Sequence, residues 1–90
     1  MKLFEPIRIG AMEVPNRIVF PPIGSQLAEQ GGTVGDTTIN YYARRAEGGA
    51  GLVIVEYTAV DDRRYSSHRQ LRLSNDSFIP GMRRLAAAIK

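Results

Sequence analysis

Residues 36–56 read DTTINYYARRAEGGAGLVIVE, and within them a helical pattern changes into a strand pattern. In the first half, apolar side chains recur at the spacing of one helical face, at Ile39, Tyr42, Ala43 and Ala46. This spacing predicts a helix from Asp36 or Thr37 to about Glu47. Gly48-Gly49 ends it, because glycine tolerates the left-handed conformation that follows a last helical turn. The second half, residues 51–56, is almost entirely apolar and predicts a strand buried on both faces.

Upstream of this helix the sequence predicts a hairpin, a strand and a loop. Ile18-Val19-Phe20 is a compact apolar run that Pro21-Pro22 stops, which predicts another strand buried on both faces. Residues 23–35 are polar and glycine-rich and predict a loop. Residues 7–14 alternate apolar and polar side chains around Gly10-Ala11, which predicts a short β-hairpin with a two-residue turn.

Downstream of the second strand the sequence predicts a loop and a final helix. Residues 61–72 are polar and rich in arginine, which is typical of an exposed loop. A cap at Asn75, Asp76 or Ser77 begins a helix that runs to Ile89. Pro80 fits only the first turn of that helix, because a proline further along would break it, and this favours the later of the three caps. The apolar face of the helix is formed by Met82, Leu85, Ala86 and Ile89.

The order of these elements predicts an α/β fold with a parallel sheet. Buried strands that alternate with helices are joined by right-handed crossovers in such folds. Two parallel strands cannot cover themselves, because each needs neighbours to satisfy its hydrogen bonds and bury its side chains. We therefore expect residues 1–90 to form the opening part of a larger domain.

Composition excludes several classes of site. The 90 residues contain no cysteine and one histidine, which excludes a disulfide, a thiolate metal site and a cysteine nucleophile, and predicts no metal site. No segment is apolar for long enough to form a membrane helix or the core of a signal peptide. We therefore expect a cytoplasmic protein with no membrane partner.

The chain carries a formal net charge of +3, and its arginines include three adjacent pairs, at positions 44–45, 63–64 and 83–84. Such pairs are typical of solvated surfaces, although a basic protein is also compatible with a nucleic-acid or phosphate partner. His68 is expected to be a surface side chain. Tyr65, in the predicted arginine-rich loop, is a candidate for an aromatic residue of a lid.

Functional sites of parallel α/β folds form where the strands end at their carboxyl termini. After the first strand, Pro22 stiffens the chain and Gly24 allows a flat ligand to approach the backbone closely. An ordinary turn from strand to loop explains the same residues. Glu56 ends the second strand with a carboxylate, which needs a partner if it is buried. Arg17, or an arginine outside this chain, is the expected ion-pair partner, and a role as general base is the alternative.

Four segments together resemble the old yellow enzyme family of FMN-dependent NADH:flavin oxidoreductases. They are LFEPIRIG at residues 3–10, NRIVFPPIG at 16–24, YYARRAEGGAGLVI at 41–54, and the stretch from Asn75 through Pro80-Gly81 to Leu85-Ala86. They occur in the order of the family and span essentially all of the chain.

The resemblance implies a (β/α)8 TIM barrel, of which these residues supply the N-terminal β-hairpin and the first two βα units. It implies FMN as the cofactor and NAD(P)H as the reductant, with hydride passed through FMN to an electron-poor small-molecule acceptor such as an activated alkene. Pro22, Ile23, Gly24 and Tyr57 match positions that contact the flavin in the family. Gly24 stands where many members carry Cys or Thr, and Tyr57 stands where a small residue is common. We therefore expect any flavin tuning by Cys or Thr to be absent or to pass to Ser25, and the Tyr57 ring to turn away or reshape the pocket.

The resemblance identifies no catalytic residue, because the proton donor and the phosphate-binding residues of the family lie on later strands. An inactive, truncated remnant of such an enzyme is the first alternative. A small basic module that binds nucleic acid is the second. We expect the isolated chain to associate with further copies or with the remainder of a barrel, because its strands leave unpaired edges.

Overall fold

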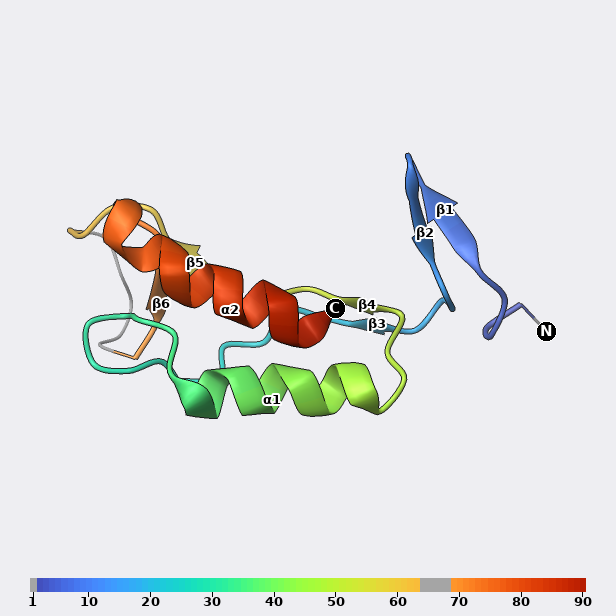
Figure 1. Ribbon diagram of the computed structural model, residues 1–90, viewed down its shortest axis with the longest axis horizontal. Helices are drawn as coiled ribbons and strands as arrows, with labels where there is room; N and C mark the ends of the chain where they lie inside the picture. Colours follow the sequence, from blue (N-terminus) through green and yellow to red (C-terminus); the bar gives the residue numbers. More distant parts are fainter. Residues whose placement is uncertain (1, 64–68) are drawn as a thin grey trace.

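The computed structural model describes residues 2–63 and 69–90, and begins with a two-stranded hairpin. Strands β1 (Ile7–Ile9) and β2 (Met12–Val14) pair in an antiparallel register. Gly10 makes the turn with φ of 60°, a conformation that glycine adopts without steric cost. The predicted hairpin is therefore confirmed, and it stands apart from the helices (Figure 1).

The helix and the two strands around it form one parallel βαβ unit. Strand β3 (Val19–Phe20) pairs in parallel with β4 (Leu52–Val53), and α1 (Asp36–Glu47) lies between them in the chain. Tyr42, on the predicted apolar face of α1, is completely buried. The predicted helix and the parallel arrangement are confirmed, although both strands are shorter than the apolar runs that predicted them.

A close contact between Asn16 and the glycines after α1 fixes the start of this unit. The Asn16 side-chain Nδ2 donates a hydrogen bond to the Gly49 carbonyl at 2.8 Å, and its Oδ1 accepts one from the Ile18 amide at 3.0 Å. A Cβ atom on Gly51 would lie 2.7 Å from the Asn16 carbonyl oxygen. Glycine at position 51 thus allows β4 to begin directly beside β3.

The second helix begins with a short 3-10 turn, η1 (Asp76–Phe78), and continues as α2 (Ile79–Ile89). Asn75 caps the turn, because its side-chain oxygen accepts a hydrogen bond from the Ser77 amide at 2.9 Å. The prediction of the later cap is wrong, because a 3-10 turn precedes α2 and lets the earliest candidate cap it while Pro80 still lies in the first turn. Pro80 lies in the first turn of α2, as predicted. Helix α2 packs beside α1 (Figure 1), and its Leu85 is buried in the contact region.

The prediction of an exposed loop over residues 61–72 is wrong at its end. Strand β5 (Thr58–Ala59) pairs in parallel with β6 (Leu71–Arg72), and Leu71 is completely buried. Leu71 and Leu73 alternate with a single polar residue, Arg72, and this alternation is too short to predict a strand. Tyr65 and His68 lie outside the described residues.

Strand β6 also supports the loop that follows β3. The Arg72 amide donates a hydrogen bond to the Gly32 carbonyl at 3.0 Å, and the Arg69 guanidinium donates to the Ala28 carbonyl at 3.3 Å. The buried core joins this loop to the helices and consists of Ala28, Val34, Tyr42, Leu71 and Leu85. The loop between β3 and α1 is therefore part of the packed structure.

The apolar strands are less buried than predicted. Ile18, Val19 and Ile54 are exposed, and the residues of β4 are only half-buried. The physical reason is that β3 and β4 form a sheet of two strands within the described part of the chain, so each has a neighbour on one side. The exposure of these apolar residues agrees with the prediction that the two parallel strands need further neighbours.

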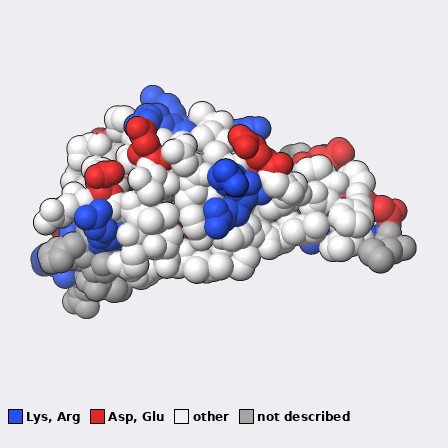
Figure 2. All heavy atoms as spheres, turned by 90° about the horizontal axis from the view of Figure 1, so that it is seen from below, with Lys and Arg blue, Asp and Glu red and all other residues white. Residues whose placement is uncertain are grey.

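The arginine pairs of both helices are exposed at the surface, as predicted, and Arg64 lies outside the described residues. Arg84 forms an ion pair with Asp36 at 2.8 Å, and the Arg45 guanidinium lies 4.0 Å from the centre of the Tyr41 ring. On the face shown in Figure 2, basic and acidic side chains are interspersed. In residues 2–63 and 69–90, no helix has the length and apolar character needed to cross a membrane.

We expect the isolated 90-residue chain to associate or to fold incompletely, because Ile18, Val19 and Ile54 expose apolar surface beside strand edges that have no partner in residues 2–63 and 69–90. Light scattering after size-exclusion chromatography, combined with thermal unfolding at several concentrations, measures this. A monomer of normal size with a sharp and concentration-independent transition would contradict the expectation.

Candidate functional site

The carboxyl ends of β3 and β4 form an exposed edge. After β3, Pro22, Ile23 and Gly24 are all exposed, and the Ile23 side chain is among the more accessible apolar groups at 48%. After β4, Tyr57 is 45% exposed. The Tyr57 ring lies directly against Gly24, so the structure brings these predicted site residues together from two strands.

Beneath this edge lies a buried carboxylate, Glu56, which is only 3% exposed. Its Oε1 accepts hydrogen bonds from the Ser25 hydroxyl at 2.6 Å and from the Tyr42 hydroxyl at 2.8 Å. Its Oε2 accepts a bond from the Ser25 amide at 3.3 Å. Glu56, Ser25 and Tyr42 form what we call the carboxylate cluster, which joins β3, β4 and α1 at one point.

Tyr42 acts as both donor and acceptor in the carboxylate cluster. Besides donating to Glu56, its hydroxyl accepts a hydrogen bond from the Glu56 amide at 2.9 Å. Burial of the phenol, together with the adjacent carboxylate, raises the pKa of Tyr42 well above its ordinary value of 10.0. The hydroxyl therefore keeps its proton and remains a donor throughout the range in which proteins are normally stable.

The predicted ion pair between Glu56 and Arg17 is wrong. Arg17 precedes β3, and its guanidinium donates to the Pro6 carbonyl at 3.5 Å. Glu56 follows β4, so the two side chains lie at opposite ends of a parallel pair. Within residues 2–63 and 69–90 Glu56 takes part in no ion pair; hydroxyl and amide donors satisfy it.

The roles of three residues at the site are not predicted by the sequence. It indicates Ser25 only as a possible flavin-tuning residue and Tyr42 only as part of the helix core, and it predicts neither as a hydrogen-bond donor to Glu56. The parallel pairing contained the missing signal, because it places the residues that follow β3 beside those that follow β4. Gln26 is the third of these residues. Its backbone adopts a left-handed φ of 61°, which is uncommon for a residue other than glycine. Its side-chain Nε2 donates a hydrogen bond to the Tyr57 hydroxyl at 3.4 Å.

The edge fits one part of a flat heterocyclic ligand. Ile23 offers apolar surface, Tyr57 offers an aromatic ring with a hydroxyl, and Pro22 limits the motion of the backbone just before Ile23. These groups suit the ring system of a flavin. The charged phosphate of FMN needs cationic or helix N-terminal partners, which the four predicted site residues do not supply.

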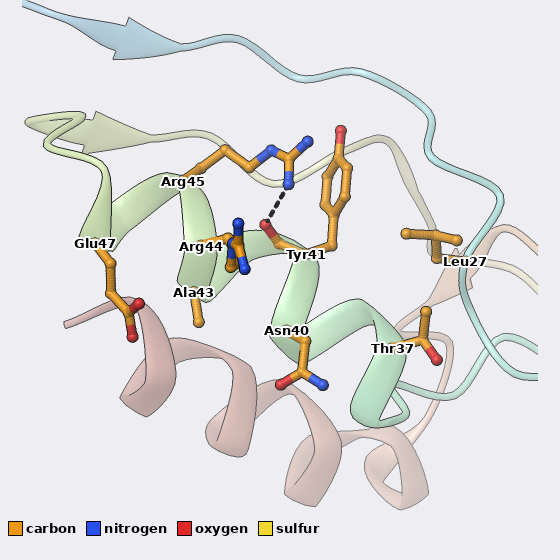
Figure 3. Close-up of a pocket in the computed structure, with 8 residues that line it drawn as sticks. All are labelled: Leu27, Thr37, Asn40, Tyr41, Ala43, Arg44, Arg45 and Glu47. Atoms are coloured by element: carbon orange, nitrogen blue, oxygen red, sulfur yellow. Dashed lines mark hydrogen bonds between the residues drawn. The ribbon is translucent and has the colours of Figure 1, made fainter.

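A hollow lined by residues of α1 and by Leu27 of the loop after β3 is shown in Figure 3. It is an open depression whose lining includes Asn40, Tyr41 and Arg45, and Arg45 donates a hydrogen bond to the Tyr41 carbonyl at 3.2 Å. None of the predicted site residues lines it. Because parallel α/β folds form their sites at the carboxyl ends of the strands, we regard the edge at Gly24 and Tyr57 as the better candidate site.

The parallel βαβ unit and its edge define a class of protein, the α/β proteins that bind ligands at the carboxyl ends of their strands. Comparison with known proteins gives the family. The model of the NADH:flavin oxidoreductase / NADH oxidase family matches residues 2–90, and the chain belongs to this family. The predicted family is thereby confirmed. Enzymes of the family use FMN with NAD(P)H as the reductant, as the resemblance implied.

Individual relatives agree with this assignment. The chain is 42% identical over 88 residues to an NADH oxidase of Thermoanaerobacter brockii, which covers 97% of this chain and 14% of that protein. Its fold matches 2-naphthoyl-CoA reductase with a TM-score of 0.94 at 31% identity, over 98% of this chain and 14% of that one. It matches the old yellow enzyme from Pichia sp. with a TM-score of 0.89 at 27% identity, over 98% and 23%. The chain thus spans a small part of the proteins that it resembles.

Replacing Tyr42 with phenylalanine tests the carboxylate cluster in the intact protein that carries this segment. The change leaves the Glu56 amide unpaired and removes one donor from its carboxylate, so we expect a loss of about 1–3 kcal/mol in the free energy of unfolding. Urea denaturation measures it. A difference below about 0.5 kcal/mol would show that the buried cluster contributes little.

The same pair of proteins tests the raised pKa of Tyr42. In the unfolded chain this phenol loses its proton near its ordinary pKa of 10.0, whereas the folded protein retains it. The stability that Tyr42 contributes is therefore complete below pH 10 and declines as the pH rises beyond it. We expect the difference between wild type and Tyr42→Phe to be constant at neutral pH and to shrink above pH 10.

Proposed function

We propose that this chain is the N-terminal segment of an FMN-dependent oxidoreductase that passes hydride from NAD(P)H to an electron-poor acceptor. The observation that carries the proposal is the exposed edge of Ile23, Gly24 and Tyr57, in a chain that belongs to the NADH:flavin oxidoreductase family. In this proposal residues 1–90 form the incomplete N-terminal part of an FMN-binding domain. They supply the hairpin and the first two βα units of a (β/α)8 barrel.

The groove beside β4 supports the barrel arrangement. It has a volume of about 440 Å³, and its apolar lining includes Val53, Val55, Met82 and Ile89. These side chains come from the second strand and from the helix that follows it. A neighbouring strand placed there would cover them and pair with the side of β4 that has no partner strand among the described residues.

The division of labour in the proposed enzyme follows from these positions. When bound, FMN supplies the redox chemistry, by accepting hydride from NAD(P)H and delivering it to an acceptor such as an activated alkene. Pro22, Ile23, Gly24 and Tyr57 bind and orient its ring system. The carboxylate cluster holds the two strand ends together, so that the binding surface keeps its shape. The acceptor also gains a proton, whose donor lies outside these four residues.

We infer that residues 1–90 alone do not turn over NAD(P)H. The chain spans 14% of the related NADH oxidase, and a barrel site is assembled from the ends of several strands. Its partners in the proposed enzyme are the remaining strands of the barrel and a small-molecule acceptor.

The test is FMN binding by the intact protein with a charge introduced at the edge. We expect Ile23→Glu to weaken FMN binding by at least about tenfold, because a carboxylate placed against the ring loses its hydration without gaining a partner. Quenching of flavin fluorescence on binding gives the dissociation constant.

Ile9→Glu in the hairpin is the matched control, because Ile9 has nearly the same exposure, 51% against 48% for Ile23. We expect it to leave the dissociation constant for FMN within about threefold of the wild-type value. Equal weakening by both variants would attribute the loss to general destabilisation. Unchanged binding in Ile23→Glu would remove Ile23 from the proposed flavin site.

A further inference from the structure

Tyr57 and Gly24 are packed so closely that neither position is independent of the other. A Cβ atom on Gly24 would lie 2.7 Å from Cε1 of the Tyr57 ring and 3.5 Å from Cδ1 and Cζ. Gly24 is not among the residues with positive φ, so the site needs glycine for space and not for an unusual backbone conformation. The Tyr57 ring thus occupies the volume that a side chain at position 24 would fill.

The other hydroxyl groups at this edge are already committed to internal hydrogen bonds. The Ser25 hydroxyl donates to Glu56 at 2.6 Å and accepts from the Leu27 amide at 3.3 Å. The Thr58 hydroxyl donates to the Glu56 carbonyl at 3.0 Å. The protons of both hydroxyl groups are therefore already used within the protein.

The Tyr57 hydroxyl differs from these two. It accepts one long hydrogen bond, at 3.4 Å, from the side-chain Nε2 of Gln26. Its own proton has no hydrogen-bond acceptor among the described residues. The residue is also nearly half exposed, so the phenol can meet a ligand at the edge. A phenol has both a donor proton and a flat ring, which are the two features that recognise a polar heterocycle.

We propose that Tyr57, seated on Gly24, donates a hydrogen bond to the flavin ring and thereby sets its redox potential. This rests on the proposed function, since it assumes that the edge binds FMN. A donor at the ring stabilises the additional negative charge of the two-electron reduced form more than it stabilises the oxidised form. Tyr57 therefore raises the midpoint potential of the bound flavin.

The experiment uses the intact flavoprotein and compares Tyr57→Phe with wild type. Tyr57→Phe keeps the ring and its packing against Gly24 but removes the hydroxyl. We expect FMN to remain bound, the midpoint potential to fall, and the ratio of affinities for reduced and oxidised flavin to decrease roughly fivefold, as for the loss of one hydrogen bond. Tyr41→Phe is the matched control, because it makes the same chemical change on α1, and its potential should equal the wild-type value.

A double-mutant cycle between positions 24 and 57 tests whether the close packing against Gly24 positions the Tyr57 ring. Gly24→Ala forces the Tyr57 ring to move, so we expect it to lower the potential in the same direction as Tyr57→Phe. In a Tyr57→Ala background there is no ring to displace, and Gly24→Ala should then have no further effect on the potential.

The outcomes separate this inference from the function on which it rests. An intact wild-type protein that binds no FMN contradicts the proposed function and removes the basis of the inference. Bound FMN whose potential is the same in wild type and Tyr57→Phe overturns the inference alone. If Gly24→Ala changes the midpoint potential equally in the wild-type and Tyr57→Ala backgrounds, Gly24 does not act by positioning the Tyr57 ring.

Discussion

The candidate site depends on how one buried negative charge is satisfied. Glu56 is enclosed where β3, β4 and α1 meet, and an enclosed carboxylate is costly unless several donors surround it. Ser25 supplies two donors from the end of β3, and Tyr42 supplies one from the helix. Each of the three elements must therefore hold its position for the charge to remain satisfied. Tyr57 and Gly24 are the chain neighbours of Glu56 and Ser25. The positions of these two exposed residues are therefore fixed by the same hydrogen bonds.

The sequence predicted the elements of the fold better than the contacts between them. The spacing of Ile39, Tyr42 and Ala46 predicts a helical face, and the apolar runs at 18–20 and 51–56 predict strands, although the observed strands are shorter than those runs. Strand β6 was missed because Leu71 is its only strongly apolar residue, and its burial comes from packing against distant parts of the chain.

The site was predicted in part, for a related reason. The rule that sites form at the carboxyl ends of parallel strands led to the segments that contain Gly24 and Tyr57, and the structure brings these two residues into contact. The partner of Glu56 was assigned by charge, which favoured Arg17, although the parallel direction of the strands separates the two. The close approach of Tyr57 to Gly24 depends on a side-chain rotamer, which no pattern in the sequence records.

The loop after β3 contributes to the site by being held in place. Its Gly32 carbonyl accepts a hydrogen bond from β6, and its Ala28 belongs to the buried core. The end of β3 is thus fixed on both sides, by Glu56 at Ser25 and by β6 further along the loop. A binding surface that is already ordered loses less conformational entropy when a ligand binds.

The hydroxyl and amide donors that surround Glu56 have a consequence for how the protein responds to salt. Dissolved ions screen attractions between exposed charges, but they do not enter a buried cluster of hydroxyl and amide donors. Surface pairs such as Arg84 with Asp36 weaken as ionic strength rises, whereas the bonds from Tyr42 and Ser25 to Glu56 retain their strength. The strand ends at the candidate site therefore keep their geometry in dilute and in concentrated electrolyte alike.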